Sequence, residues 1–262
     1  PPPPPCPVPA ATEPLVTEPA ARAPRGGGRA LLLLGGAAAL EPAQRLAWAI
    51  AQRTGAQIYA EFAIGRVARG QGRLPLERVP YDGDQAVKAL APFDHIILVN
   101  AKPPVGFFAY PDKPSLHYRP DAQIHQLSRF DQDPVAALQA LADELGAPSV
   151  AFPDPGPRPE PVRGAPTPEG LARTIAALMP EQAIISDESI SFGRGFYAST
   201  HAAPPHDWLH LAGGAIGDGL PVATGAGVAR AGRRGISVHA DGSGMYSLQS
   251  PWAPARGGVA CT

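Results

Sequence analysis

The amino-acid sequence predicts an α/β protein made of two consecutive domains, each built around a parallel β-sheet. Two observations lead to this fold class. Short apolar runs typical of buried strands alternate with segments of helical periodicity, as in proteins whose parallel sheets are covered by helices. Proline-rich segments over 1–29 and 151–166 read as linkers, and they leave domains over 30–150 and 167–262 of the 262-residue chain.

The first domain opens with a continuous apolar run. Residues 29–36 (RALLLLGG) predict a buried strand closed by two glycines, and residues 41–54 follow with apolar side chains at helical spacing, among them Leu46 and Ile50. The rest of the domain continues this alternation. Further strands are expected over 56–60, 95–100, 115–118 and 123–127, and further helices over 84–90 and 135–145.

The second domain repeats the pattern after the linker. Thr167 is expected to cap a helix over 168–179. Ser243 is expected to cap a later helix, in which Pro251 and Pro254 predict a break. Strands are expected over 183–186, 208–211 and 235–240, and a helix of small residues over 219–231.

Composition excludes several classes of function. The chain carries 22 Lys+Arg against 23 Asp+Glu, a balance that argues against an electrostatic nucleic-acid interface. No apolar run approaches the roughly 20 residues of a membrane span. The two cysteines, Cys6 and Cys261, lie near opposite ends and predict neither a disulfide framework nor a zinc site. No secretory signal is visible, so a cytoplasmic location is expected.

A dense glycine motif lies between two expected elements of the second domain. Residues 213–221 read GGAIGDGLP. Glycines at this density allow positive φ angles and a close approach of the backbone to a ligand. Pro221 suits the first turn of the helix that follows. The motif therefore indicates a binding loop ahead of that helix.

The sharpest motif follows the last expected strand. Residues 240–244 read ADGSG, so an apolar strand ends in Asp241 and a glycine-serine turn. Ligands of parallel sheets bind beyond the carboxyl ends of the strands. An aspartate there can hold a hard cation, and the following amides can hold phosphate oxygens. The alternative is an ordinary Asp-Gly turn with a helix cap.

Gly35 and Gly36 stand where a dinucleotide-binding turn would stand, after a strand and before a helix. The full G-x-G-x-x-G pattern is absent, and Glu61 is the nearest acidic residue for a ribose contact. Close packing of helix on strand explains the two glycines better. A nucleotide-binding module therefore stays open as an alternative.

Together, GGAIGDGLP at 213–221 and DGS at 241–243 resemble the diphosphate-binding domain of thiamine diphosphate enzymes. The resemblance is to the group of acetolactate synthase large-subunit homologues and benzoylformate decarboxylase, and it covers about residues 30–256. Its motifs are strong for the class of cofactor and weaker for the substrate. Supporting segments are 78–81, 101–111, 187–189, 205–208 and 246–252.

The resemblance implies a domain organisation. Such enzymes contain a pyrimidine-binding, a middle and a diphosphate-binding domain. Residues 30–150 match the middle domain and 167–262 match the first part of the diphosphate-binding domain. No segment matches the pyrimidine-binding domain, which carries the glutamate that activates the cofactor, and the asparagine expected downstream of Asp241 is missing. The chain is thus expected to be a fragment, and no catalytic residue is assigned in it.

The resemblance also implies a cofactor site. Asp241 matches the Mg²⁺ ligand, and Gly242 and Ser243 match the turn that cradles the diphosphate. Ile216 matches the apolar residue that holds the cofactor in its bent form, and Gly214 lies where the backbone meets the aminopyrimidine. Two further residues, Ser189 and Ser191, are expected near the diphosphate.

The implied activity is that of the whole parent enzyme. It is decarboxylation of a 2-keto acid with thiamine diphosphate and Mg²⁺, followed by carboligation in a synthase or by protonation in a benzoylformate-type decarboxylase. The parent is expected to be a homodimer or homotetramer, without nucleic-acid or membrane partners, and the fragment is expected to be inactive alone. A non-catalytic nucleotide-binding module and a non-functional remnant are the alternatives.

Overall fold

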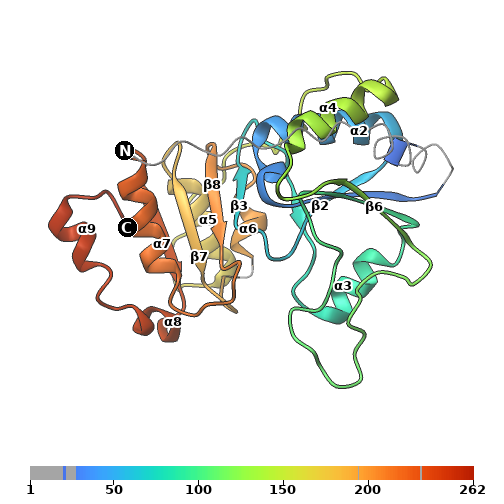
Figure 1. Ribbon diagram of the computed structural model, residues 1–262. Helices are drawn as coiled ribbons and strands as arrows, with labels where there is room; N and C mark the ends of the chain where they lie inside the picture. Colours follow the sequence, from blue (N-terminus) through green and yellow to red (C-terminus); the bar gives the residue numbers. More distant parts are fainter. Residues whose placement is uncertain (1–19, 22–27, 194, 231) are drawn as a thin grey trace. The chain divides into compact units, whose positions relative to one another are not determined.

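The computed structural model describes residues 20–21, 28–193, 195–230 and 232–262. The linker expected over 1–29 therefore lies largely outside the described residues. The chain divides into two compact units, each with its own β-sheet (Figure 1). Among the described residues, unit 1 comprises those up to Phe62 together with Leu76–Ala151, and unit 2 comprises Ala63–Pro75 together with those of Phe152–Thr262.

Unit 1 contains a five-stranded sheet in the order β4-β2-β1-β5-β6, in which every neighbouring pair is parallel. The central strand β1 is buried along its whole length, as its run of leucines predicts. The strands are β1 (Ala30–Leu34), β2 (Gln57–Ala60), β4 (Glu77–Arg78), β5 (His95–Val99) and β6 (Gln123–Ser128).

Helices cover both faces of this sheet. Figure 1 shows α2 and α4 on one face and α3 on the other. Asp82 caps α3 and Asp133 caps α4 through side-chain hydrogen bonds to backbone amides, so local sequence sets both starts. The helices are η1 (Gly36–Ala39, a 3₁₀ turn), α2 (Glu41–Thr54), α3 (Gly83–Leu90) and α4 (Pro134–Leu145).

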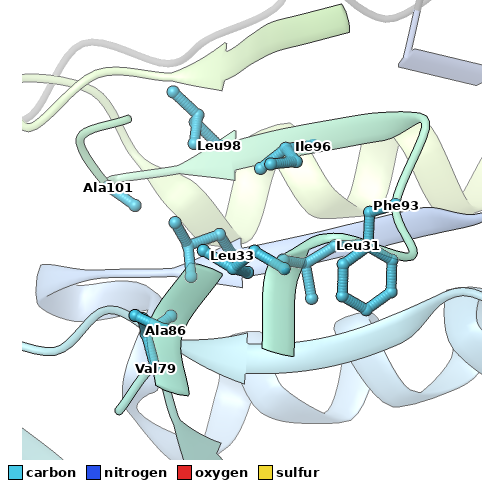
Figure 2. Packing of buried hydrophobic residues seen from close by; sticks show 9 residues of the cluster. Leu31, Leu33, Val79, Ala86, Phe93, Ile96, Leu98 and Ala101 are labelled. Atoms are coloured by element: carbon cyan, nitrogen blue, oxygen red, sulfur yellow. The ribbon is translucent and has the colours of Figure 1, made fainter. Parts of the chain in front are cut away.

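Alternate residues of β1 and β5 form the core on the α3 side. Leu31 and Leu33 of β1 pack with Ile96 and Leu98 of β5 and with Phe93 (Figure 2). Successive side chains of a strand point to opposite faces, so these residues share one face. Each is almost fully buried, which for a leucine or isoleucine is worth about 1.5–3 kcal/mol.

The segment expected to form a strand over 115–118 does not form one. Its only β-type pairing in the described chain is an isolated antiparallel bridge between Val105 and Leu116. Pro114 and Pro120 flank the segment and lack the N–H that a ladder requires. The residues instead form part of an irregular loop between β5 and β6.

Unit 2 contains a four-stranded sheet in the order β3-β8-β7-β9. The neighbours β8, β7 and β9 are parallel, whereas β3 pairs antiparallel with β8 at the edge. The sequence had indicated a parallel sheet, and the sheet is rich in parallel pairs with one antiparallel pair at its edge. The strands are β3 (Arg66–Arg69), β7 (Ile184–Glu188), β8 (His206–His210) and β9 (Gly235–His239).

The edge strand β3 was not expected from the sequence. It is four residues long, contains two arginines and lies between Gly65 and Gly70, so it carries no apolar run. Its partner is remote, because Val67 pairs with Trp208. The segment 63–75, expected in the first domain, consequently belongs to unit 2.

The helices of unit 2 largely agree with those predicted from the sequence. Thr167 caps α5 by accepting a hydrogen bond from the Gly170 amide, as predicted. Figure 1 shows α7 on one side of the sheet and α5 with α6 on the other. The helices are α5 (Pro168–Leu178), α6 (Phe196–Ser199), α7 (Gly219–Ala229), α8 (Asp241–Tyr246) and α9 (Trp252–Gly257).

One helix start was predicted wrongly. Helix α8 begins at Asp241, so Ser243 lies in its first turn and does not cap it. The hydroxyl of Ser243 donates to the Ala240 carbonyl at 3.0 Å. The expected break is present, since α8 ends at Tyr246 and Pro251 stands at the N-cap of α9.

Within the described parts of the chain, every helix is too short or too polar to cross a membrane.

Candidate functional site

The two glycine-rich motifs meet at one edge of the unit 2 sheet. Strands β7, β8 and β9 are parallel, so their carboxyl ends share that edge. The Ala240 amide, just before α8, donates to the Glu188 carbonyl at the end of β7 over 3.1 Å. The loop 213–219 reaches the same place through the Glu188 side chain. The structure thus brings together the segments that the sequence singled out.

Glu188 is the residue on which these segments converge. Its side chain has no exposed surface. The amide of Gly217 donates to Oε1 at 2.6 Å, and the amide of Gly219 donates to Oε2 at 2.9 Å. His239 Nδ1 lies 3.4 Å from Oε2. Backbone donors and an imidazole therefore surround a buried carboxylate, which would otherwise be costly to bury.

The loop 213–219 has a backbone that only glycine adopts readily. Gly214 has a φ of +66° and Gly217 a φ of +93°. A Cβ atom on Gly217 would lie 2.6 Å from Tyr246 Cβ, so the loop packs directly on α8. The Ser247 hydroxyl donates to the Gly217 carbonyl at 2.8 Å. Ile216, between the two glycines, is 57% exposed and turns its side chain outward.

The turn at the start of α8 is open. Asp241 and Gly242 are exposed, and no heavy atom of the described residues lies within 4 Å of a Cβ placed on Gly242. No side chain caps α8, and within the described part of the chain the Asp241 carboxylate makes no hydrogen bond or ion pair. Ser243 is buried and its hydroxyl is bonded internally, so its backbone is what this turn can offer to a ligand.

The two serines after β7 are placed differently from each other. Ser189 is buried, and both its amide and its hydroxyl donate to Asp187 Oδ1. Ser191 is exposed. Ile190 between them has a φ of +52°, a strained conformation for a β-branched residue. The segment therefore forms a tight turn at the sheet edge, and the buried hydroxyl of Ser189 is already hydrogen-bonded within it.

Besides Asp187, this edge carries three acidic residues. Glu188 and Asp241 are described above, and Asp218 stands at the N-cap of α7. Burial, and then the neighbouring charge of Glu188, raise the pKa of Asp218. Among the described residues, no group of three or more His, Cys, Asp or Glu side chains could hold a metal. A cation at Asp241 would thus need oxygens from a ligand and from water.

Sequence reasoning missed the part played by Glu188, His239 and Ser247. His239 ends β9, is 13% exposed, and its Nε2 is buried without a hydrogen-bond partner among the described residues. The only available signal was the position of Glu188 at the end of a strand, ahead of the glycine loop. Its link to Gly217 spans 29 residues, so no local pattern reveals it.

The second candidate position lies in unit 1, at Gly35. A Cβ atom there would lie 2.1 Å from the Asn100 carbonyl oxygen and 2.7 Å from Glu61 Oε1. Gly35 therefore allows the end of β1 to pack against the segment after β5. Burial raises the pKa of Glu61, although the Lys102 amide donates to its carboxylate. This geometry favours the packing explanation of Gly35.

Comparison with solved structures identifies the class of fold. The chain superposes on a thiamine diphosphate-dependent 4-hydroxybenzoylformate decarboxylase of Rhodococcus jostii with a TM-score of 0.74 and 21% identity. The match covers 95% of this chain and 50% of the decarboxylase. The protein thus has the α/β fold, with two parallel-rich sheets, of about half of such an enzyme.

Comparison of sequences identifies the family, although no family model matches the chain. A Mycobacterium tuberculosis protein, IlvX, named as a candidate acetolactate synthase large subunit, is 38% identical over 250 residues, which are 95% of this chain and 48% of that protein. Benzoylformate decarboxylase of Pseudomonas aeruginosa is 32% identical over 127 residues, which are 47% of this chain and 24% of that enzyme. The chain is a homologue of the thiamine diphosphate-dependent enzymes of this group, and it spans about half the length of the first relative.

Proposed function

We propose that the chain forms part of a thiamine diphosphate- and Mg²⁺-dependent enzyme of the acetolactate synthase type that acts on 2-keto acids. In this proposal residues 30–150, apart from the segment 63–75 that belongs to unit 2, are the middle domain, and 167–262 are the first part of the diphosphate-binding domain. The observation that carries the proposal is the meeting of loop 213–219 and turn 241–243 at the carboxyl edge of a parallel sheet.

The turn 241–243 has the donors and acceptors that a metal-bound diphosphate requires. A diphosphate is too anionic to bind without a cation and hydrogen-bond donors. Asp241 offers an exposed carboxylate, an oxygen ligand that Mg²⁺ prefers. Gly242 and Ser243 offer backbone N–H groups, and the open space beside Gly242 lets phosphate oxygens approach. These residues therefore fit the diphosphate end of the cofactor.

The loop 213–219 suits the organic rings at the other end of the cofactor. Gly214 is exposed, and the exposed Ile216 side chain provides an apolar surface against which the cofactor rings can bend. Ser191 is exposed at the same sheet edge, whereas the hydroxyl of Ser189 is bonded to Asp187 and would contribute only after that bond opens. When bound, thiamine diphosphate supplies a nucleophilic carbon and an electron sink for decarboxylation.

The activity belongs to the whole parent enzyme. Because the chain spans about half of its first relative, we expect it to bind the cofactor but not to turn over a 2-keto acid by itself. Synthase and decarboxylase chemistry use the same two motifs, so both names found among the relatives are compatible with them. A homodimer or homotetramer is the expected state of the parent.

Calorimetric titration with thiamine diphosphate and Mg²⁺ tests the proposal. Submillimolar binding that Asp241→Ala abolishes is expected. Glu181→Ala is the matched control, because it removes another exposed carboxylate from unit 2 and should leave binding unchanged. Binding of FAD or an adenine nucleotide alone would instead support the nucleotide-binding module. If none of these ligands binds, the result would support the non-functional remnant.

A further inference from the structure

We infer that Glu188 is a positioning residue that shapes loop 213–219 and fastens it to turn 240–243. The inference rests on the proposed function and adds the residue that organises its site. The buried Glu188 side chain does not face the proposed cofactor. Its effect is indirect, because it holds the loop that places Gly214 and Ile216.

The side chain of Glu188 provides the first link. Its two carboxylate oxygens each accept a different loop amide, from Gly217 at 2.6 Å and from Gly219 at 2.9 Å. Hydrogen bonds to an ionised group are stronger than neutral ones, and this group is completely buried. Both positions need an acceptor, so a carboxylate fits and a primary amide would turn its NH₂ group toward one of the two donors.

The backbone of Glu188 provides the second link. Its carbonyl accepts the Ala240 amide at 3.1 Å, and the Ser243 hydroxyl lies 3.5 Å from the same oxygen. Residue 188 therefore contacts the loop with its side chain and the turn with its main chain. A substitution at this position changes the first link and keeps the second.

The loop has only one other hydrogen-bonded attachment to the α8 side in the described structure, the 2.8 Å bond from Ser247 to the Gly217 carbonyl. Gly217, with its φ of +93°, is thus bonded on its N–H side by Glu188 and on its carbonyl side by Ser247. Removing the Glu188 acceptors would free the N–H side of the residue at which the loop bends.

Hydrogen exchange of the chain without cofactor tests the first link directly. In the wild type, the Gly217 and Gly219 amides should exchange at least about 100-fold more slowly than the intrinsic rate of an unprotected amide. Glu188→Gln should accelerate at least one of them about tenfold or more, the range expected for losing a hydrogen bond to a charged group. The matched control is Glu181→Gln, at an exposed glutamate in the turn that precedes β7.

Two titrations separate positioning from general loss of structure. Inorganic pyrophosphate with Mg²⁺ is expected to contact only the turn 241–243. Thiamine diphosphate with Mg²⁺ is expected to contact the loop 213–219 as well. Glu188→Gln should weaken thiamine diphosphate binding about tenfold or more and change pyrophosphate binding by less than about twofold. A variant that is merely less folded would lose both ligands in parallel, and that result would overturn the inference.

The remaining outcomes also test the positioning role of Glu188. Equal thiamine diphosphate affinity for wild type and Glu188→Gln would overturn the positioning role and leave the proposed function intact. A wild type that binds no thiamine diphosphate would overturn both. If Glu188→Gln does not fold, the exchange rates of the wild type decide, since fast exchange at Gly217 and Gly219 would show that the carboxylate does not hold the loop.

Discussion

Replacing Gly217 with alanine tests the packing of the glycine loop on α8. The new Cβ would lie 2.6 Å from Tyr246 Cβ, a distance that real Cβ atoms essentially never show. The φ of +93° adds backbone strain for any residue with a Cβ. Strain of about 1–2 kcal/mol and overpacking of about 1–3 kcal/mol sum to a loss of roughly 3 kcal/mol in the free energy of unfolding of unit 2.

Tryptophan fluorescence during urea unfolding measures this loss. The chain has three tryptophans, and in a Trp48→Phe background the remaining two, Trp208 and Trp252, both lie in unit 2. The matched control is Gly213→Ala, because its Cβ would have no heavy atom of the described chain within 4 Å. Gly217→Ala with the stability of Gly213→Ala would refute the packing of the loop on α8.

Three further predictions concern stability. Leu33→Ala in the fully buried centre of unit 1 should lower its free energy of unfolding by about 2–5 kcal/mol in urea titrations, whereas Leu178→Ala, at an exposed position, should change stability by less than about 0.5 kcal/mol; similar losses would contradict the core. Thr167→Ala should cost about 1 kcal/mol by removing the cap of α5, and Thr167→Ser should restore it, so failure of the serine variant would argue against capping. Burial lowers the pKa of His206 to about 4, so the folded state disfavours the protonated form and stability should fall by about 3 kcal/mol as pH drops from 6.5 toward 4; a His206→Leu variant with the same pH dependence would disprove this cause.

Much of unit 1 could be predicted because its signals are local. The leucine run of β1, the apolar run of β5 and the proline after Asp133 each indicate their element without knowledge of the partner. Strand β3 could not be predicted, because Val67 becomes part of a strand only by pairing with Trp208. An edge strand of four residues with two arginines has no pattern of its own.

The candidate site divides in the same way. Turn 241–243 was recognisable because an aspartate and glycines directly follow an apolar strand. The burial of Glu188 depends on amides at Gly217 and Gly219, about 30 residues further along the chain. The inward direction of the Ser243 hydroxyl depends on α8 beginning at Asp241, which the flanking sequence does not decide.

The most direct test of the central claim is a crystal structure of the chain grown with thiamine diphosphate and Mg²⁺. We expect Asp241 to coordinate the Mg²⁺ ion and the backbone amides of Gly242 and Ser243 to face the diphosphate, with Ile216 against the cofactor rings. A structure in which the Asp241 carboxylate is turned away from the ion, or in which the diphosphate binds beside Gly35 in unit 1, would contradict it.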